Sequence, residues 1–254
     1  MQRSCESITT AICCRNVGKH FYYYDHRLAS LREVFIRRLR RQPEEKKDPH
    51  FTIEDFNLTV ARGESVALIG ANGSGKSTIL RLLAGIYVPS HGEIVIEGRV
   101  AAVIELGAGF HPDLTGAENI EIYGTVMGLT RAEIRGKYED IVAFAGLHEF
   151  IEVPVKYYSS GMQARLAFAV TVCIEPDILL LDEVLAVGDQ EFRAKCFKRL
   201  VELHRAGRTL VIATHDLDSA SRFCSRAVWI EKGRIRMEAD IDTVRKAYEG
   251  GVTT

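Results

Sequence analysis

A glycine-rich stretch at residues 70–77 has the residue types and spacing of a phosphate-binding loop. It consists of Gly70, Ala71, Asn72, Gly73, Ser74, Gly75, Lys76 and Ser77, which match G-x-x-x-x-G-K-[ST] at every required position. In such a loop the lysine reaches the β- and γ-phosphates of a nucleotide, and the serine hydroxyl binds Mg²⁺. The stretch therefore predicts a site for a nucleoside triphosphate and Mg²⁺.

The residues on both sides of this loop would give it the required shape. Residues 64–69 include an apolar run typical of a buried strand, and residues 78–84 combine good helix formers with an apolar spacing near 3.6. Free N–H groups and the dipole at a helix N-terminus favour bound anions. A chance glycine-rich turn is the alternative, and the flanking strand and helix argue against it. We also expect Asn72, Ser74 and Thr78 to contact the nucleotide.

Two adjacent carboxylates follow a second apolar run. Residues 178–181 read as a buried strand, and Asp182 and Glu183 come directly after it. Open α/β sheets bind ligands at the carboxyl ends of their strands. Asp182 suits Mg²⁺, and Glu183 is placed to polarise an attacking water. An ordinary acidic strand end is the alternative, which the upstream phosphate loop disfavours.

Two further stretches leave both structural and functional interpretations open. Residues 209–213 predict a strand that leads to His215, and a single histidine at a strand end is usually structural. Ser159, Ser160 and Gly161 precede a helical run at residues 163–173. This helix N-terminus could bind phosphate, or it could be a capped helix with no ligand.

Composition excludes several classes of protein. The chain has 254 residues, 46% of them hydrophobic and 26% charged, with a net charge of −1, which argues against a general nucleic-acid binder. No apolar run approaches the roughly 20 residues that span a bilayer, and the first residues do not form a signal peptide. The six cysteines lack C-x-x-C spacing, so we expect reduced thiols and no metal site built from them.

The order of the expected elements predicts a largely parallel α/β core. Strands at about residues 51–60, 64–69, 178–181 and 209–213 alternate with helices, whereas a helical block at about 112–165 interrupts the core. Within that block Thr115 can cap one helix, and Thr130 with Glu133 forms a capping box for the next. Residues 227–237 predict a hairpin.

The segment before the core contains an aromatic cluster and a basic helix. Phe21, Tyr22, Tyr23 and Tyr24 stand in a row, either as packing on an edge strand or as a platform for a flat ring. Residues 28–42 predict a basic amphipathic helix, which either packs on its own domain or contacts a partner or anionic lipid. A charged linker with proline at both ends follows it.

Together these motifs resemble the ATP-binding subunits of ABC transporters, over about residues 10–240. The family signature L-S-G-G-Q appears here in altered form, as Tyr158-Ser159-Ser160-Gly161-Met162, shortly before the strand that carries Asp182 and Glu183. The resemblance implies an α/β fold of the phosphate-loop NTPase type. It would be a single ABC nucleotide-binding domain over residues 1–254, with a RecA-like core, an antiparallel β subdomain and a helical subdomain.

The resemblance also implies how residues would share the work of an ATPase. Lys76, Glu183 and His215 would be catalytic, with His215 contacting the γ-phosphate and orienting water. Ser159, Ser160 and Gly161 would bind the ATP held by a second copy, so that a homodimer encloses two ATP molecules, and Asp189 would act across that interface. Phe21 would stack on adenine, with Tyr22 and Tyr23 as alternatives.

One departure and one longer stretch refine the resemblance. Where the family usually has a glutamine that touches Mg²⁺, this chain has Glu105, so we expect Ser77, Asp182 and Glu105 around the metal. Residues 105–120, the altered signature and the insertion at 27–50 look like the exporters of O-antigen, capsular polysaccharide and teichoic acid, in the short form without a C-terminal carbohydrate-binding domain.

We therefore expect an ATPase that powers export of a polysaccharide or lipid-linked glycan through a separate transmembrane permease. It would lie at the cytoplasmic face of the inner membrane, without nucleic acid, and touch the membrane indirectly or through the helix at residues 28–42. The alternatives are a soluble ABC ATPase acting on DNA or the ribosome, a different transported substrate, and a nucleotide-regulated binding module without turnover. The first lacks its usual coiled coil, zinc cysteines or second cassette, and Asp182, Glu183 and His215 argue against the last.

Overall fold

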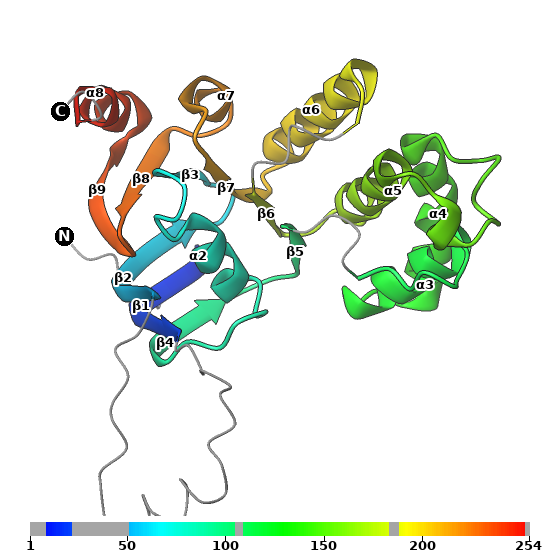
Figure 1. The fold of residues 1–254 in the computed structure, drawn as a ribbon, viewed down its shortest axis with the longest axis horizontal. Coiled ribbons are helices and arrows are strands. Elements are labelled where there is room, and N and C mark those ends of the chain that lie inside the picture. Colours follow the sequence, from blue (N-terminus) through cyan, green and yellow to red (C-terminus); the bar gives the residue numbers. More distant parts are fainter. Residues whose placement is uncertain (1–8, 22–50, 105–108, 183–187, 252–254) are drawn as a thin grey trace, which may run out of the picture.

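The computed structural model describes residues 9–21, 51–104, 109–182 and 188–251, which form two β-sheets and their surrounding helices (Figure 1). The strands are β1 (Thr10–Phe21), β2 (Phe51–Ala61), β3 (Ser65–Ile69), β4 (His91–Ile96), β5 (Val100–Val103), β6 (Ile178–Asp182), β7 (Thr209–Thr214), β8 (Arg226–Glu231) and β9 (Arg234–Asp240). The helices are α2 (Lys76–Leu83), α3 (Gly116–Val126), α4 (Arg131–Ala145), α5 (Ser160–Cys173), α6 (Gln190–Arg205), α7 (Leu217–Ser221) and α8 (Ile241–Gly251), with a 3₁₀ turn at Val155–Tyr157.

The larger sheet has the order β5-β6-β7-β3-β8-β9, and every neighbouring pair except β8 and β9 is parallel. All five residues of β3 and the first four of β6 are buried. Such continuous apolar strands are typical of a parallel sheet that is covered on both faces. The predicted α/β fold with a largely parallel core is confirmed, and β8 and β9 form the predicted hairpin.

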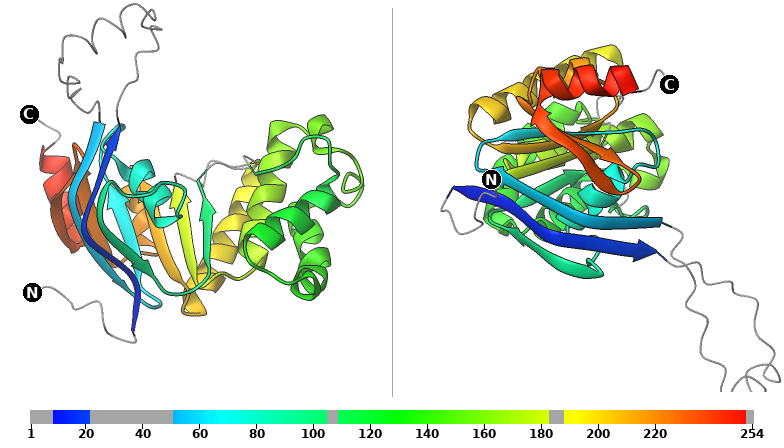
Figure 2. Two further views of the ribbon diagram at one scale, coloured as in Figure 1. Left: turned by 90° about the horizontal axis from the view of Figure 1, so that it is seen from below. Right: turned by 90° about the vertical axis from the view of Figure 1, so that its left-hand side faces the viewer.

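The smaller sheet is antiparallel, with β1 between β2 and β4. Helix α2 lies between the two sheets, as Figures 1 and 2 show, and its Ile79, Leu80 and Leu83 are fully buried in a core shared with β1, β2 and β3. A second core covers the opposite face of the larger sheet and includes residues of α5, α6, α7 and α8. Helix α2, which follows the phosphate loop, is therefore packed between the smaller and the larger sheet.

Helices α3, α4 and α5 gather at one end of the molecule, beyond β5 and β6 (Figure 1). Both predicted caps are present. The Glu118 amide donates to Thr115 Oγ1 at 3.2 Å, and the Glu133 amide donates to Thr130 Oγ1 at 3.3 Å. In return, each glutamate carboxylate accepts a hydrogen bond from the backbone amide of its cap residue. Helices α3 and α4 lie within residues 112–165, and α5 begins there and continues to Cys173.

Two features differ from the expectations. Helix α8 has no counterpart among the elements expected from the sequence. Four buried cysteines are free thiols, as expected: Cys14, Cys173, Cys196 and Cys224. Cys13, however, is disulfide-bonded. The sequence does not predict this bond, because spacing along the chain does not reveal which cysteines folding brings together.

Among the described residues, no helix combines the length and apolar character that crossing a membrane requires.

Candidate functional site

The phosphate loop links the end of β3 at Ile69 to the start of α2 at Lys76. Gly75 is the residue before the helix and has a φ of 115°, which favours glycine because a Cβ is strained there. The Ser74 amide closes the turn by donating to the Ala71 carbonyl at 3.1 Å. An α-helix cannot satisfy the amides of its own first turn, so the start of α2 offers N–H donors to an anion.

The side chain of Lys76 is folded back over the loop. Lys76 is only 5% exposed, and its Nζ donates to the carbonyls of Gly70 at 2.7 Å and Ala71 at 3.1 Å. These bonds hold the ammonium group beside the helix start, so a positive charge and free amides share one location. Both features favour the phosphates of a nucleotide.

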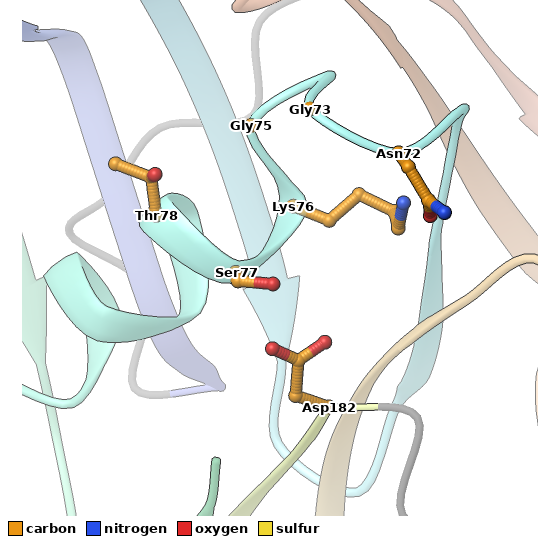
Figure 3. Close-up of a pocket in the computed structure, with 7 residues that line it drawn as sticks. All are labelled: Asn72, Gly73, Gly75, Lys76, Ser77, Thr78 and Asp182. Carbon is orange, nitrogen blue, oxygen red and sulfur yellow. The ribbon is translucent and has the colours of Figure 1, made fainter. Parts of the chain in front are cut away.

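A cleft of about 590 Å³ opens at this point (Figure 3). It is lined by Asn72, Gly73, Gly75, Lys76, Ser77, Thr78 and Asp182. Asp182 comes from β6 and the other residues from the loop and α2, so the fold unites the two motifs that the sequence places far apart. In Figure 3 the Ser77 hydroxyl and the Asp182 carboxylate are directed into the same space, whereas the Thr78 side chain lies on the other side of the helix start.

The donors around the cleft fit a nucleotide and a divalent cation. A hydroxyl and a carboxylate are the oxygen ligands that Mg²⁺ prefers, and the cleft joins Ser77 to Asp182. Ser74 is 6% exposed, and its Oγ has no hydrogen-bond partner in the described part of the chain. A Cβ built on Gly73 would meet no atom within 4 Å, so there is open space above the loop.

His215 lies at the same edge of the larger sheet. Thr214 pairs with Ile69, and Ala213 pairs with Asp182, so the residues after β3, β6 and β7 meet at the carboxyl ends of the strands. His215 is exposed and is not among the residues that line the cleft. The strand pairing therefore places His215 at the edge of the sheet that carries the phosphate loop and Asp182. His215 does not, however, line the cleft together with Lys76 and Asp182.

The altered signature forms a capped helix start. The Met162 amide donates to Ser159 Oγ at 3.2 Å, and Ser159 and Ser160 are exposed. Tyr158 is buried just before them and donates to the Phe150 carbonyl at 2.6 Å. Burial raises the pKa of Tyr158 to about 12, so its hydroxyl keeps the proton that this bond needs. None of these residues, nor Gly161, lines the cleft of its own chain.

Asp189 and Phe21 lie outside the cleft lining as well. Asp189 caps α6 by accepting from the Phe192 amide at 2.8 Å. Phe21 ends β1 and packs edge-on against Tyr87 with ring centroids 5.4 Å apart, and Lys19 Nζ lies 5.4 Å from the Phe21 centroid. Sequence reasoning missed Tyr87, which comes from the connection after α2.

Sequence reasoning also missed Gly233, which contacts the loop from the β8–β9 turn. Its amide donates to the Ser74 carbonyl at 2.8 Å, and its own carbonyl accepts from the Glu54 amide at 3.1 Å. A Cβ on Gly233 would lie 1.9 Å from the Thr52 carbonyl oxygen. Gly233 thus connects the loop to β2, and the Gly within the predicted hairpin is the signal for a close backbone approach.

Several expected site residues lie outside the described residues. They are Glu183, Glu105, Tyr22, Tyr23 and Tyr24, together with the helix predicted at residues 28–42.

Comparison with known proteins gives the family. The family model described as ABC transporter matches residues 53–186, which is more than half of the chain and contains both the phosphate loop and Asp182. This chain belongs to the ABC transporter family. It is accordingly an ATP-binding cassette with the ATPase fold, which confirms the resemblance stated from the motifs.

Individual members of the ABC family are similar over most of the chain. The O-antigen export system ATP-binding protein RfbB of Klebsiella pneumoniae is 44% identical over 92% of this chain and 95% of its own length. RfbB of Myxococcus xanthus is 47% identical over 79% of this chain, but the match spans 46% of that protein. The teichoic acids export ATP-binding protein TagH of Staphylococcus haemolyticus is 36% identical over 95% of this chain and 89% of its length.

Solved structures agree on the ABC fold. An ATP-binding subunit of an ABC transporter superposes with a TM-score of 0.74 at 23% identity and covers 94% of both chains. A dimeric, post-hydrolysis ATP-binding cassette bound to ADP and Pi gives a TM-score of 0.69 at 23% identity, over 91% of this chain and 98% of that one.

Proposed function

We propose that this chain hydrolyses ATP to power export of a polysaccharide or lipid-linked glycan through a separate transmembrane permease. The observation that carries the proposal is the cleft that joins Lys76 and Ser77 of the phosphate loop to Asp182 of β6. The glycan as cargo is supported by the relatives, whose names assign them to O-antigen and teichoic acid export and which match most of this chain.

The chain's own residues would divide the chemistry of hydrolysis among them. Lys76 and the amides at the start of α2 would hold the phosphates and stabilise the charge that develops on them. Glu183 would accept a proton from the attacking water, and His215 would orient that water. Ser77, Asp182 and Glu105 would hold Mg²⁺, which when bound neutralises part of the phosphate charge. Phe21 would stack on the adenine ring.

A second copy of the chain would complete each site. Ser159, Ser160 and Gly161 are exposed or half-exposed at the start of α5 and lie outside the cleft of their own chain. A helix N-terminus there would add N–H donors to the γ-phosphate held by the partner copy. Asp189 at the start of α6 would act at the same interface, so two ATP molecules would lie between two chains.

The site of action would be the cytoplasmic face of the inner membrane, where a permease provides the path for the glycan. The helix predicted at residues 28–42 supports this placement, because its arginines would be attracted by the anionic lipids of that membrane face. We propose no contact with nucleic acid, since the net charge is −1.

The proposal is tested by placing Glu183→Gln in the chromosomal gene and in the purified chain. Removing the general base should lower ATP hydrolysis at least about 100-fold while ATP binding persists, since base catalysis contributes 10²–10⁴-fold. In the cell, the lipid-linked glycan should accumulate on the cytoplasmic side, as detected by extraction and by loss of the polymer from the surface.

A matched control is Glu191→Gln, which changes an exposed carboxylate in the first turn of α6. This control should hydrolyse ATP and export glycan at the normal rate. Wild-type hydrolysis by Glu183→Gln would contradict the assignment of the base. Loss of hydrolysis with undisturbed surface glycan would instead contradict the assignment of the cargo.

A further inference from the structure

The C-terminal helix α8 carries an arginine that binds the short helix following His215. Arg245 Nη2 donates to the Leu217 carbonyl at 3.0 Å, and Arg245 Nη1 forms an ion pair with Asp218 Oδ1 at 3.0 Å. The Arg245 side chain is 26% exposed. One guanidinium group therefore holds both the backbone and a side chain at the first turn of α7.

Helix α7 needs such support because it is too short to be stable alone. It has five residues, and isolated helices of that length do not persist in water. At its start the Asp216 amide donates to Thr214 Oγ1 at 2.9 Å, and the Asp218 amide donates to Asp216 Oδ1 at 3.0 Å. His215 lies between Thr214 and Asp216, within the first of these two turns, so its position is tied to that of α7.

Helix α8 is itself firmly attached to the larger sheet. Val244 is fully buried and Ile241 is 6% exposed. Tyr248 packs edge-on against Trp229 of β8 with centroids 5.3 Å apart. Because β8 pairs directly with β3, the strand that leads into the phosphate loop, α8 is fixed relative to the nucleotide cleft.

We propose that Arg245 is a positioning residue that holds His215 at the distance from the cleft at which it serves hydrolysis. This inference rests on the role proposed for His215. Arg245 does not touch the cleft, and it acts by connecting α7 to the sheet through α8. Removing its side chain would break the bonds to the Leu217 carbonyl and the Asp218 carboxylate and would loosen the attachment of the segment that carries His215.

A purely stabilising role for Arg245 makes a different prediction. An exposed ion pair contributes little, whereas a half-buried guanidinium bonded to a carbonyl contributes more, so some loss of stability is expected in either case. Stability alone would leave kcat per folded molecule unchanged. A positioning role should lower kcat, leave KM for ATP unchanged, and depend on the presence of His215.

The experiment is a double-mutant cycle on ATP hydrolysis by the full chain. Arg245→Ala should lower kcat about tenfold with KM for ATP changed less than twofold, and His215→Ala should lower kcat further. In the His215→Ala background, Arg245→Ala should have no additional effect, because the residue that it positions is gone. Asp218→Asn keeps the bond to the Leu217 carbonyl, so it should cause a smaller loss.

Lys246→Ala is the matched control, because it removes a neighbouring exposed cation of α8 and should leave kcat unchanged. Wild-type kcat in Arg245→Ala, a raised KM, or equal losses with and without His215 would each overturn the inference. If Arg245→Ala fails to fold, Asp218→Asn is carried through the same cycle and decides the question. If His215→Ala itself hydrolyses ATP normally, the proposed role of His215 fails rather than that of Arg245 alone.

Discussion

Two glycines of the phosphate loop are required for different physical reasons. Gly70 has a φ of 157°, and a Cβ there would lie 2.3 Å from the Ile230 carbonyl oxygen of β8. Gly73 has a φ of 76° but a Cβ there would meet nothing within 4 Å. Gly70 thus permits a close approach between the loop and a neighbouring strand, whereas Gly73 only provides a left-handed turn.

This difference predicts unequal effects of the same substitution. Gly73→Ala should lower the free energy of unfolding by about 1–2 kcal/mol, the strain of a left-handed residue. Gly70→Ala should cost about 3 kcal/mol or more, because the loop must also move away from β8. Urea denaturation of both variants measures the difference. Equal losses would show that the contact with Ile230 is unimportant.

Among the elements, those specified by local sequence could be predicted and those fixed by distant contacts could not. The phosphate-loop strand, turn and helix are continuous in sequence, and both capping boxes lie within four residues. The contact between Gly233 and Ser74 joins the β8–β9 turn to the phosphate loop after β3, and it follows only from the pairing of β3 with β8. It therefore had no signal beyond a glycine in a hairpin.

Helix α8 is different, because its signals were present in the sequence. Asp240 accepts from the Thr243 amide at 2.9 Å, as an N-terminal cap does. Ile241, Val244 and Tyr248 then follow at helical spacing and pack on β8. Because β9 runs directly into α8 with no loop between them, the boundary is marked only by this cap and by the change of apolar period from two to 3.6.

Two glycines in helices α3 and α4 allow the effect of helix propensity on stability to be separated from the effect of side-chain packing. Gly136 lies in the exposed face of α4, and a Cβ there would meet nothing within 4 Å, so Gly136→Ala should raise the free energy of unfolding by about 1 kcal/mol. Gly124 of α3 is the control, since its Cβ would lie 2.8 Å from the buried Ile134 side chain. Gly124→Ala should therefore destabilise the chain. A gain from both substitutions would mean that Ile134 moves aside at no cost.

At the scale of the whole molecule, the cleft holds only part of the proposed site. The residues that line it come from the loop, α2 and the end of β6, whereas the start of α5 lies in the helical block at one end of the molecule (Figure 1). Ser159 Oγ accepts the bond that caps α5, so its O–H group and the nearby backbone amides remain as the donors for a phosphate held by a partner copy. The proposed sharing of a site between two copies would explain why one chain carries both halves.

Mixing two inactive variants tests whether the site is shared. Lys76→Ala removes the phosphate ligand of one half. Gly161→Asp places a negative charge where the partner's γ-phosphate would bind, and acidic residues are tolerated in the first turn of a helix. Each variant alone should have lost hydrolysis, but an equal mixture should recover about a quarter of the wild-type rate, because half of the random dimers contain one complete site. Gly161→Ala, whose Cβ would meet only Ser159 Oγ at 3.8 Å, should stay active as the control. A mixture that remains as inactive as its components would show that the start of α5 does not serve the ATP of a second copy.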